Sequence, residues 1–216
     1  MKYLIVGDLH GNKPNIYFDG FDAIIAPGDF CSDATRKDMF EALRQNLQNP
    51  GSKVNWYDFV GKTKARQMVL KSIADGRKIL EFLNSFDVPV YMVPGNWEWI
   101  GEKDSDWDFL RKDRYTPMIE GLENVVDVHH RIVDAGEHQI IGHGITSGPE
   151  FPQHKEELER LKKDPKKFKQ KKADYERQMK KVDSLFRRAR KPVIFMPHNV
   201  PFNTPIDKIT NKDSPR

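Results

Sequence analysis

Four short apolar segments of this chain each end at a polar side chain that can bind a metal ion, and this repetition limits the fold more than any other feature of the sequence. The segments cover residues 2–6, 21–26, 88–93 and 192–196, and the turns after them are Gly7-Asp8, Pro27-Gly28-Asp29, Pro94-Gly95-Asn96 and Pro197-His198-Asn199. Apolar runs of this length that stop at glycine or proline are typical of buried strands. Because ligands collect at the carboxyl ends of strands in open α/β sheets, we expect the four turns to meet at one site.

Helical patterns separate the predicted strands. Apolar residues recur at three- and four-residue spacing in 35–47 and 64–86, which predicts two amphipathic helices. The buried face of the second helix is expected to carry Met68, Leu70, Ile73, Ile79, Leu80 and Leu83. Further strands are predicted at 124–128 and 139–141, with a turn at Ala135-Gly136 between them. This alternation favours a layered α/β fold with helices packed on a central sheet.

The segment 155–191 carries most of the positive charge. It holds 16 Lys or Arg against 7 Asp or Glu, a net charge of +9, so the rest of the chain is acidic although the whole chain has a net charge of +4. Pro165 is expected to divide the segment into two helices, since proline breaks the helical hydrogen-bond ladder. We predict a single domain over 1–216, with 151–191 as a helical insertion or cap. Cations are expected to bind in the acidic remainder.

Nothing in the sequence predicts a membrane anchor or an export signal. No apolar stretch approaches the ~20 residues that span a bilayer, and the first residues become polar too soon for a secretory signal. Cys31 is the single cysteine, which excludes an intramolecular disulfide and fits a reducing compartment. These features predict a cytoplasmic location.

The residues at the strand ends suit a pair of divalent cations. Two such ions about 3.5–4 Å apart can clamp a phosphate, activate a water and stabilise the leaving oxygen. Asp8 and His10 lie just past the first strand, and Asp29 follows a glycine that allows a sharp turn. Asn96 offers an amide oxygen and His198 offers an imidazole, which complete the mixed ligand set that such ions need. These five residues are our candidate catalytic and metal-binding side chains.

The same residues resemble the motifs of the calcineurin-like metallophosphoesterases, which run D-x-H, G-D, G-N-H-[D/E] and a later His. Their counterparts, in the same order, are Asp8-Leu9-His10, Gly28-Asp29, Gly95-Asn96-Trp97-Glu98 and His198. The resemblance implies a four-layer α-β-β-α fold, with a central β-sandwich flanked by helices, and a binuclear metal centre. It implies that Asp8 and His10 hold the first metal and that Asp29 bridges. Asn96 and His198 would hold the second. Manganese is expected first, with iron, zinc, nickel or cobalt as alternatives.

Two features depart from the family pattern. Trp97 stands where the family has a histidine that helps to protonate the leaving group. The final G-H-x-H motif is absent, and Gly142-His143-Gly144, its nearest imitation, precedes His198. We therefore expect the natural protein to continue past Arg216. Without that motif, the chain is expected to bind metal less tightly than its relatives.

Other polar and aromatic residues near the motifs are assigned more modest roles. Asn12, Trp97 and His143 are predicted to contact the substrate. Glu98 is expected to hydrogen-bond to the metal ligands rather than to bind metal itself. His129 and His130 are expected to face solvent.

These observations support three functional hypotheses. The first is a metal-dependent hydrolase of phosphate mono- or diesters, with a tilt toward diesters because Trp97 cannot act as the usual acid. The second is a non-catalytic scaffold of the same fold that binds a protein partner. The third is a nuclease that holds a phosphate backbone on 155–191, in which case binding weakens steeply with salt.

Overall fold

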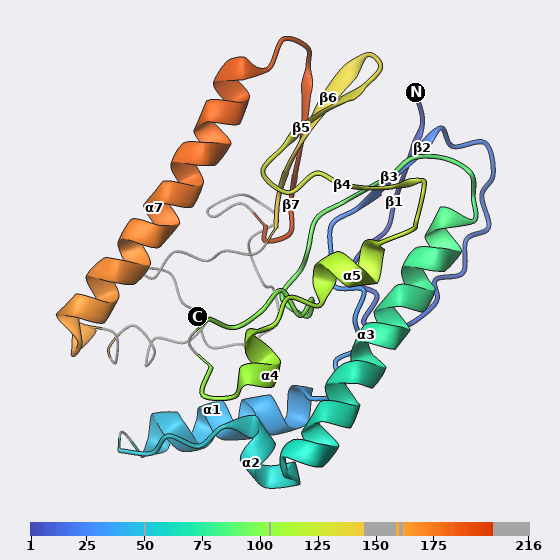
Figure 1. Ribbon diagram of the computed structural model, residues 1–216. Helices are drawn as coiled ribbons and strands as arrows, with labels where there is room; N and C mark the ends of the chain where they lie inside the picture. The colour runs from blue at the N-terminus through green and yellow to red at the C-terminus, as the bar shows by residue number, and fades with distance from the viewer. Residues whose placement is uncertain (50, 104, 145–158, 160–161, 201–216) are drawn as a thin grey trace, which may run out of the picture.

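Two β-sheets form the centre of the molecule (Figure 1). The computed structural model describes residues 1–49, 51–103, 105–144, 159 and 162–200. The first sheet has the order β1-β2-β3-β4, and its strands are β1 (Tyr3–Ile5), β2 (Ala23–Ala26), β3 (Val90–Met92) and β4 (Val125–Asp127). All neighbouring strands of this sheet are parallel, so their carboxyl ends lie at one edge.

The second sheet has the order β5-β6-β7 and follows the first in the chain. Its strands are β5 (Ile132–Ala135), β6 (His138–His143) and β7 (Val193–Pro197). β5 and β6 form an antiparallel hairpin around the predicted turn at Gly136, whereas β7 returns parallel to β6. The parallel return brings the end of β7 beside the end of β6.

The core consists of apolar side chains in two layers, because both faces of the first sheet are covered. One face packs against the second sheet through Ala23, Ile25, Tyr91, Val93, Val128, Ala135, Ile140 and Met196. The other face packs against the helices α3 (Lys62–Asn84) and α5 (Tyr115–Ile119). On the outer face of the second sheet lies α7 (Pro165–Arg188), where the rings of Phe186 and Phe195 are in contact. The predicted α-β-β-α layering is therefore confirmed.

The remaining helices lie beside α3 and were not predicted, except for the first. They are α1 (Arg36–Gln48), α2 (Trp56–Val60) and α4 (Asp108–Arg111). An aromatic cluster fills the space between these helices and α3, and it contains Trp56, Tyr57, Trp99, Trp107 and Phe109. Helices of four or five residues leave too little periodicity to be found in a sequence.

The first turn of α7 agrees with the expected break at proline. Pro165 occupies its first turn, and the Asp164 side chain accepts a hydrogen bond from the Lys167 N–H at 3.0 Å. Residues 151–158 lie outside the described part of the chain, so the predicted cap over 151–191 stays a prediction. No helix in the described ranges combines the length and the apolar character that crossing a membrane requires.

The buried face of α3 differs from the predicted face at one position. Leu80 and Leu83 are fully buried, but Leu70 is 43% exposed, and Val69 takes the inward position instead. Helical spacing allowed either residue, and packing against Trp56 and Tyr57 decides for Val69.

This difference supplies a matched pair of stability variants. Leu80→Ala removes buried methyl groups and should lower the free energy of unfolding by about 2–5 kcal/mol, whereas Leu70→Ala should change it by less than about 0.5 kcal/mol. Urea unfolding followed by circular dichroism measures both. Similar losses for the two variants would contradict the assigned face of α3.

Candidate metal centre

The five predicted metal ligands meet at the carboxyl edge of the first sheet. Asp8 and His10 follow β1, Asp29 follows β2, and Asn96 follows β3. His198 follows β7 in the second sheet and is tied to β6 by its backbone N–H, which donates to the His143 carbonyl at 3.0 Å. The structure therefore brings together side chains that are up to 190 positions apart in the sequence.

Three of these residues have a backbone conformation that favours glycine. Asp8, His10 and Asp29 have φ values of 60°, 46° and 59°. Hydrogen bonds between the two loops hold this conformation: the Asp8 N–H donates to Gly28 O at 3.0 Å, and the His10 N–H donates to Asp29 O at 2.8 Å. Non-glycine residues in the left-handed region are uncommon and collect at functional sites.

The loops after β2 and β3 touch each other through glycines. A Cβ atom on Gly28 would lie 2.5 Å from the Gly95 nitrogen, and Gly28 also has a φ of 98°. A Cβ atom on Gly95 would collide with the Asp29 carboxylate. Both positions therefore require glycine, because only a missing side chain lets these two loops approach so closely.

Glu98 binds both loops from behind the predicted ligands. Its side chain is buried, and its carboxylate accepts backbone N–H groups from Asp29 at 2.9 Å, Phe30 at 2.7 Å and Cys31 at 3.1 Å. It also accepts the N–H of Gly95. A buried carboxylate with this many donors is well satisfied and has no need of a metal ion.

Asp29 lies at the centre of the site. Its Oδ2 atom is 3.8 Å from His10 Nε2 and 3.6 Å from His198 Nε2, and Asp8 Oδ1 is 3.7 Å from His10 Nε2. The side chain of Asp29 is 3% exposed, whereas that of Asp8 is 76% exposed. The Asp29 Oδ2 atom therefore faces both imidazoles from the interior of the protein. Asp8 approaches the His10 imidazole from the solvent side.

Burial makes the charge of Asp29 costly while no cation is present. Desolvation raises its pKa to about 6, and the Trp97 N–H, which donates to Oδ1 at 2.9 Å, opposes the rise only in part. Burial is also unfavourable for the His10 ring, because its buried Nδ1 atom has no hydrogen-bond partner. Both features are typical of a site shaped for an ion.

The donor set around His198 fits a cation. Its Nδ1 atom is 2.6 Å from the Pro27 carbonyl, which can only accept, so Nδ1 carries a proton. The Nε2 atom faces two oxygens, Asn96 Oδ1 at 3.0 Å and Asp29 Oδ2 at 3.6 Å. Metal-binding histidines commonly donate their second N–H to a backbone carbonyl in this way. Among the described residues, Asp8, Asp29 and His198 also form a group with metal-ligand spacing.

The three predicted substrate contacts lie in different surroundings. Asn12 uses its amide to hydrogen-bond to the carbonyls of Leu9 and His10 at 3.0 and 3.3 Å, so it closes its own loop. The Trp97 ring packs edge-on against His10, with ring centroids 5.9 Å apart. His143 is buried at the end of β6, in a second group of imidazoles.

That second group overturns one expectation. His129 and His130 do not face solvent but are partly buried, and they pack beside His143. The sequence did indicate this group, because His129-His130 and His143 each lie at the end of an apolar strand, as the predicted metal ligands do. It was missed because these histidines belong to none of the recognised motifs.

Comparisons with known proteins place the chain in a family. A solved structure that is 15% identical matches with a TM-score of 0.37, over 59% of this chain and 44% of that chain, so the match spans less than half of its length. No curated protein matches the chain. The family model described as calcineurin-like phosphoesterase matches residues 1–214. Because this match covers nearly the whole sequence, the chain belongs to the calcineurin-like phosphoesterase family.

Proposed function

We propose that this protein is a metal-dependent phosphoesterase that hydrolyses a phosphate mono- or diester at a binuclear centre. The observation that carries the proposal is the convergence of acceptors on His198 Nε2, with Asn96 Oδ1 at 3.0 Å and Asp29 Oδ2 at 3.6 Å. An imidazole nitrogen, an amide oxygen and a carboxylate oxygen that face one another in this way can each offer a lone pair to one cation. The family membership supports the same chemistry.

The positions of the side chains support two ions rather than one. Asp8 and His10 would hold the first ion, and Asn96 and His198 would hold the second. Asp29 would bridge, since its Oδ2 atom is at similar distances from His10 and His198. This mixed set of nitrogen and oxygen ligands suits manganese, with iron, zinc, nickel or cobalt as alternatives. When bound, such a pair clamps the phosphate, activates a water and stabilises the leaving oxygen.

The substrate preference follows from Trp97. An indole cannot protonate a departing alkoxide, and its N–H is a donor only. The ring instead covers one side of His10 and helps to fix the orientation of that imidazole. We therefore expect diesters or esters with good leaving groups to be hydrolysed fastest, because they depend least on a protein acid.

The two alternatives have less support. A pure scaffold has no use for three ligands in left-handed backbone conformations, which cost stability. A nuclease would need the basic helix α7 to hold a phosphate backbone, and α7 does carry ten Lys or Arg against three Asp or Glu. Part of that charge is already paired, as in Arg177 with Asp174 and Arg187 with Asp183. Contact with nucleic acid stays a prediction.

Activity should depend on the proposed bridging residue. With Mn²⁺, the protein should hydrolyse bis-p-nitrophenyl phosphate faster than p-nitrophenyl phosphate, and Asp29→Ala should lower kcat/KM by about a hundredfold or more, since even outer partners of metal ligands cost about 10–100-fold. Asp108→Ala, which removes a carboxylate that is 88% exposed on α4, should have no effect. Activity on neither ester, or equal activity of Asp29→Ala, would contradict the proposal.

The stability of the metal-free protein should reveal the burial of Asp29. Its pKa is raised from 3.8 to about 6, so its contribution favours the folded state below about pH 4 and is lost as the pH rises through about 6. Asp29→Asn keeps the oxygen that accepts the Trp97 N–H and removes the charge. In EDTA at pH 7.5 this variant should therefore be more stable by up to about 3 kcal/mol, from about two pK units, and near pH 4 the gain should vanish. Thermal unfolding at both pH values measures it, and a destabilised variant at pH 7.5 would contradict the assigned cause.

A further inference from the structure

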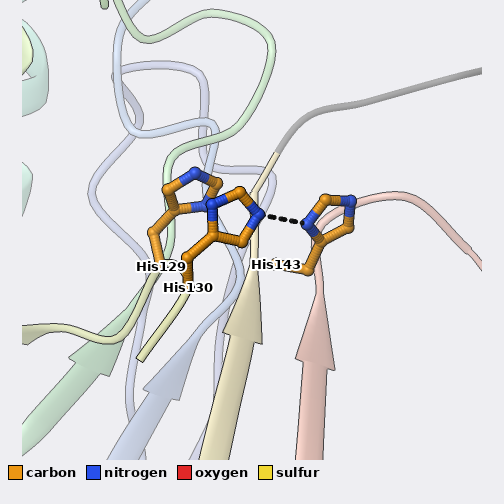
Figure 2. Close-up of side chains that lie close together, drawn as sticks. All are labelled: His129, His130 and His143. Atoms are coloured by element: carbon orange, nitrogen blue, oxygen red, sulfur yellow. Dashed lines mark hydrogen bonds between the residues drawn. The ribbon is translucent and has the colours of Figure 1, made fainter. Parts of the chain in front are cut away.

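Three imidazoles gather at a second place, beside the candidate metal centre but formed by other residues. His129 and His130 follow β4, and His143 ends β6 (Figure 2). An isolated bridge between His129 and Gly142 brings the two segments together. Among the described residues, the three side chains offer ligand atoms that all lie within 4.8 Å of one another. The proposed phosphoesterase chemistry uses none of these three rings as a metal ligand.

The distance between two of the nitrogens is the first argument for a metal. His130 Nε2 lies 3.1 Å from His143 Nδ1 (Figure 2). Two nitrogens bound to one tetrahedral zinc at about 2.0–2.1 Å are about 3.3 Å apart. The pair is therefore already spaced as ligands of one ion, and a metal would take the place of the proton that they now share.

His129 is the third member of the group and is less well placed to bind a metal. Its ring lies 3.9 Å from the His130 ring, centroid to centroid, and is tilted by only 32°. Its Nδ1 atom accepts the Gly144 N–H at 2.8 Å, so in the neutral ring Nε2 carries the proton. To bind a metal through Nδ1, His129 must release Gly144. We therefore expect it to contribute less to affinity than His130 and His143.

Backbone geometry supports a functional role for the group. His130 has a φ of 54°, in the same left-handed region as Asp8, His10 and Asp29. A hydrogen bond from its N–H to the Gly142 carbonyl, 2.9 Å long, holds it there. A histidine kept in an uncommon conformation by the neighbouring strand is directed toward His143 rather than toward solvent.

The charge state suits nitrogen coordination. Burial, and to a smaller extent the neighbouring histidines, lower the pKa of His129 and of His143 to about 4, so both rings are neutral and ready to bind metal at pH 7. The positive charges of Lys181 and Arg131 act against a cation, whereas the Asp127 carboxylate, which accepts the His129 N–H at 2.8 Å, lies on the other side of the balance. The ligand atoms that the cluster itself offers are imidazole nitrogens, which favours transition metals over magnesium and calcium.

We propose that His130 and His143, with His129 as the third and weakest ligand, form a mononuclear site for a transition metal of the zinc, cobalt, nickel or copper type. The site is separate from the binuclear centre, which uses a different set of side chains. A backbone hydrogen bond joins the two, from the His198 N–H to the His143 carbonyl.

Cobalt binding tests the proposal. Ligands of the binuclear centre are removed by mutation, so that binding to the histidine cluster is measured separately. The whole chain carrying Asp8→Ala and Asp29→Ala is titrated with Co²⁺, and visible absorption reports nitrogen-bound Co²⁺ of low coordination number. We expect one equivalent to bind with these bands. Adding His130→Gln or His143→Gln should weaken binding about tenfold or more, as even outer partners of ligands cost about 10–100-fold. His129→Gln should have a smaller effect, and Lys181→Ala should tighten binding.

His138→Gln is the matched control, because it changes a histidine of the same strand outside the cluster and should leave Co²⁺ binding unchanged. His143 lies in a buried strand, so circular dichroism checks that each variant is folded, and His130→Gln in its loop gives a second reading. No bound Co²⁺ in the Asp8→Ala, Asp29→Ala protein would overturn the proposal. Equal affinity of folded His130→Gln would do the same. Neither result bears on ester hydrolysis by the unaltered protein, which tests the binuclear centre alone.

Discussion

The site depends on one buried carboxylate that joins two loops. Glu98 accepts three successive backbone N–H groups, from Asp29 to Cys31, and a further one from Gly95. Successive N–H groups in this arrangement form an anion-binding nest, and hydrogen bonds to a charged acceptor contribute about 1.5–3 kcal/mol each. Together with the Trp97 N–H, which donates to Asp29 Oδ1, this carboxylate holds the turn after β2 against the turn after β3. Glycine at positions 28 and 95 allows the same contact sterically.

This contact explains why Asp29 is desolvated. Once Glu98 has fixed the turn, Asp29 is buried between two imidazoles, and its charge has only the Trp97 N–H and the two rings to oppose desolvation. The protein thus holds a carboxylate whose pKa is raised to about 6 by burial. If the proposed metal centre forms there, the free energy needed to desolvate this carboxylate is supplied during folding rather than during metal binding.

Much of this could be predicted from the sequence, because each strand of the site is an apolar run with a polar residue at its end. The strands β1, β2, β3 and β7, the long helices and the layered fold follow from that pattern and from the family motifs. The short helices α2, α4 and α5 could not be predicted, since tertiary packing stabilises them rather than local periodicity: α2 and α4 pack in the aromatic cluster, and α5 packs in the core beside α3. The histidine cluster was missed for a different reason. His129-His130 and His143 each lie at the end of an apolar run, but the bridge between His129 and Gly142 that brings them together is a tertiary contact.

The most direct test of the account is anomalous diffraction from crystals grown with Mn²⁺. Asp29 should lie between two anomalous peaks about 3.5–4 Å apart, with Asp8 and His10 on one ion and Asn96 and His198 on the other. Glu98 should stay bound to the backbone of both loops and should touch neither ion. A single ion that Asp29 does not contact, or a metal bound directly by Glu98, would contradict the account.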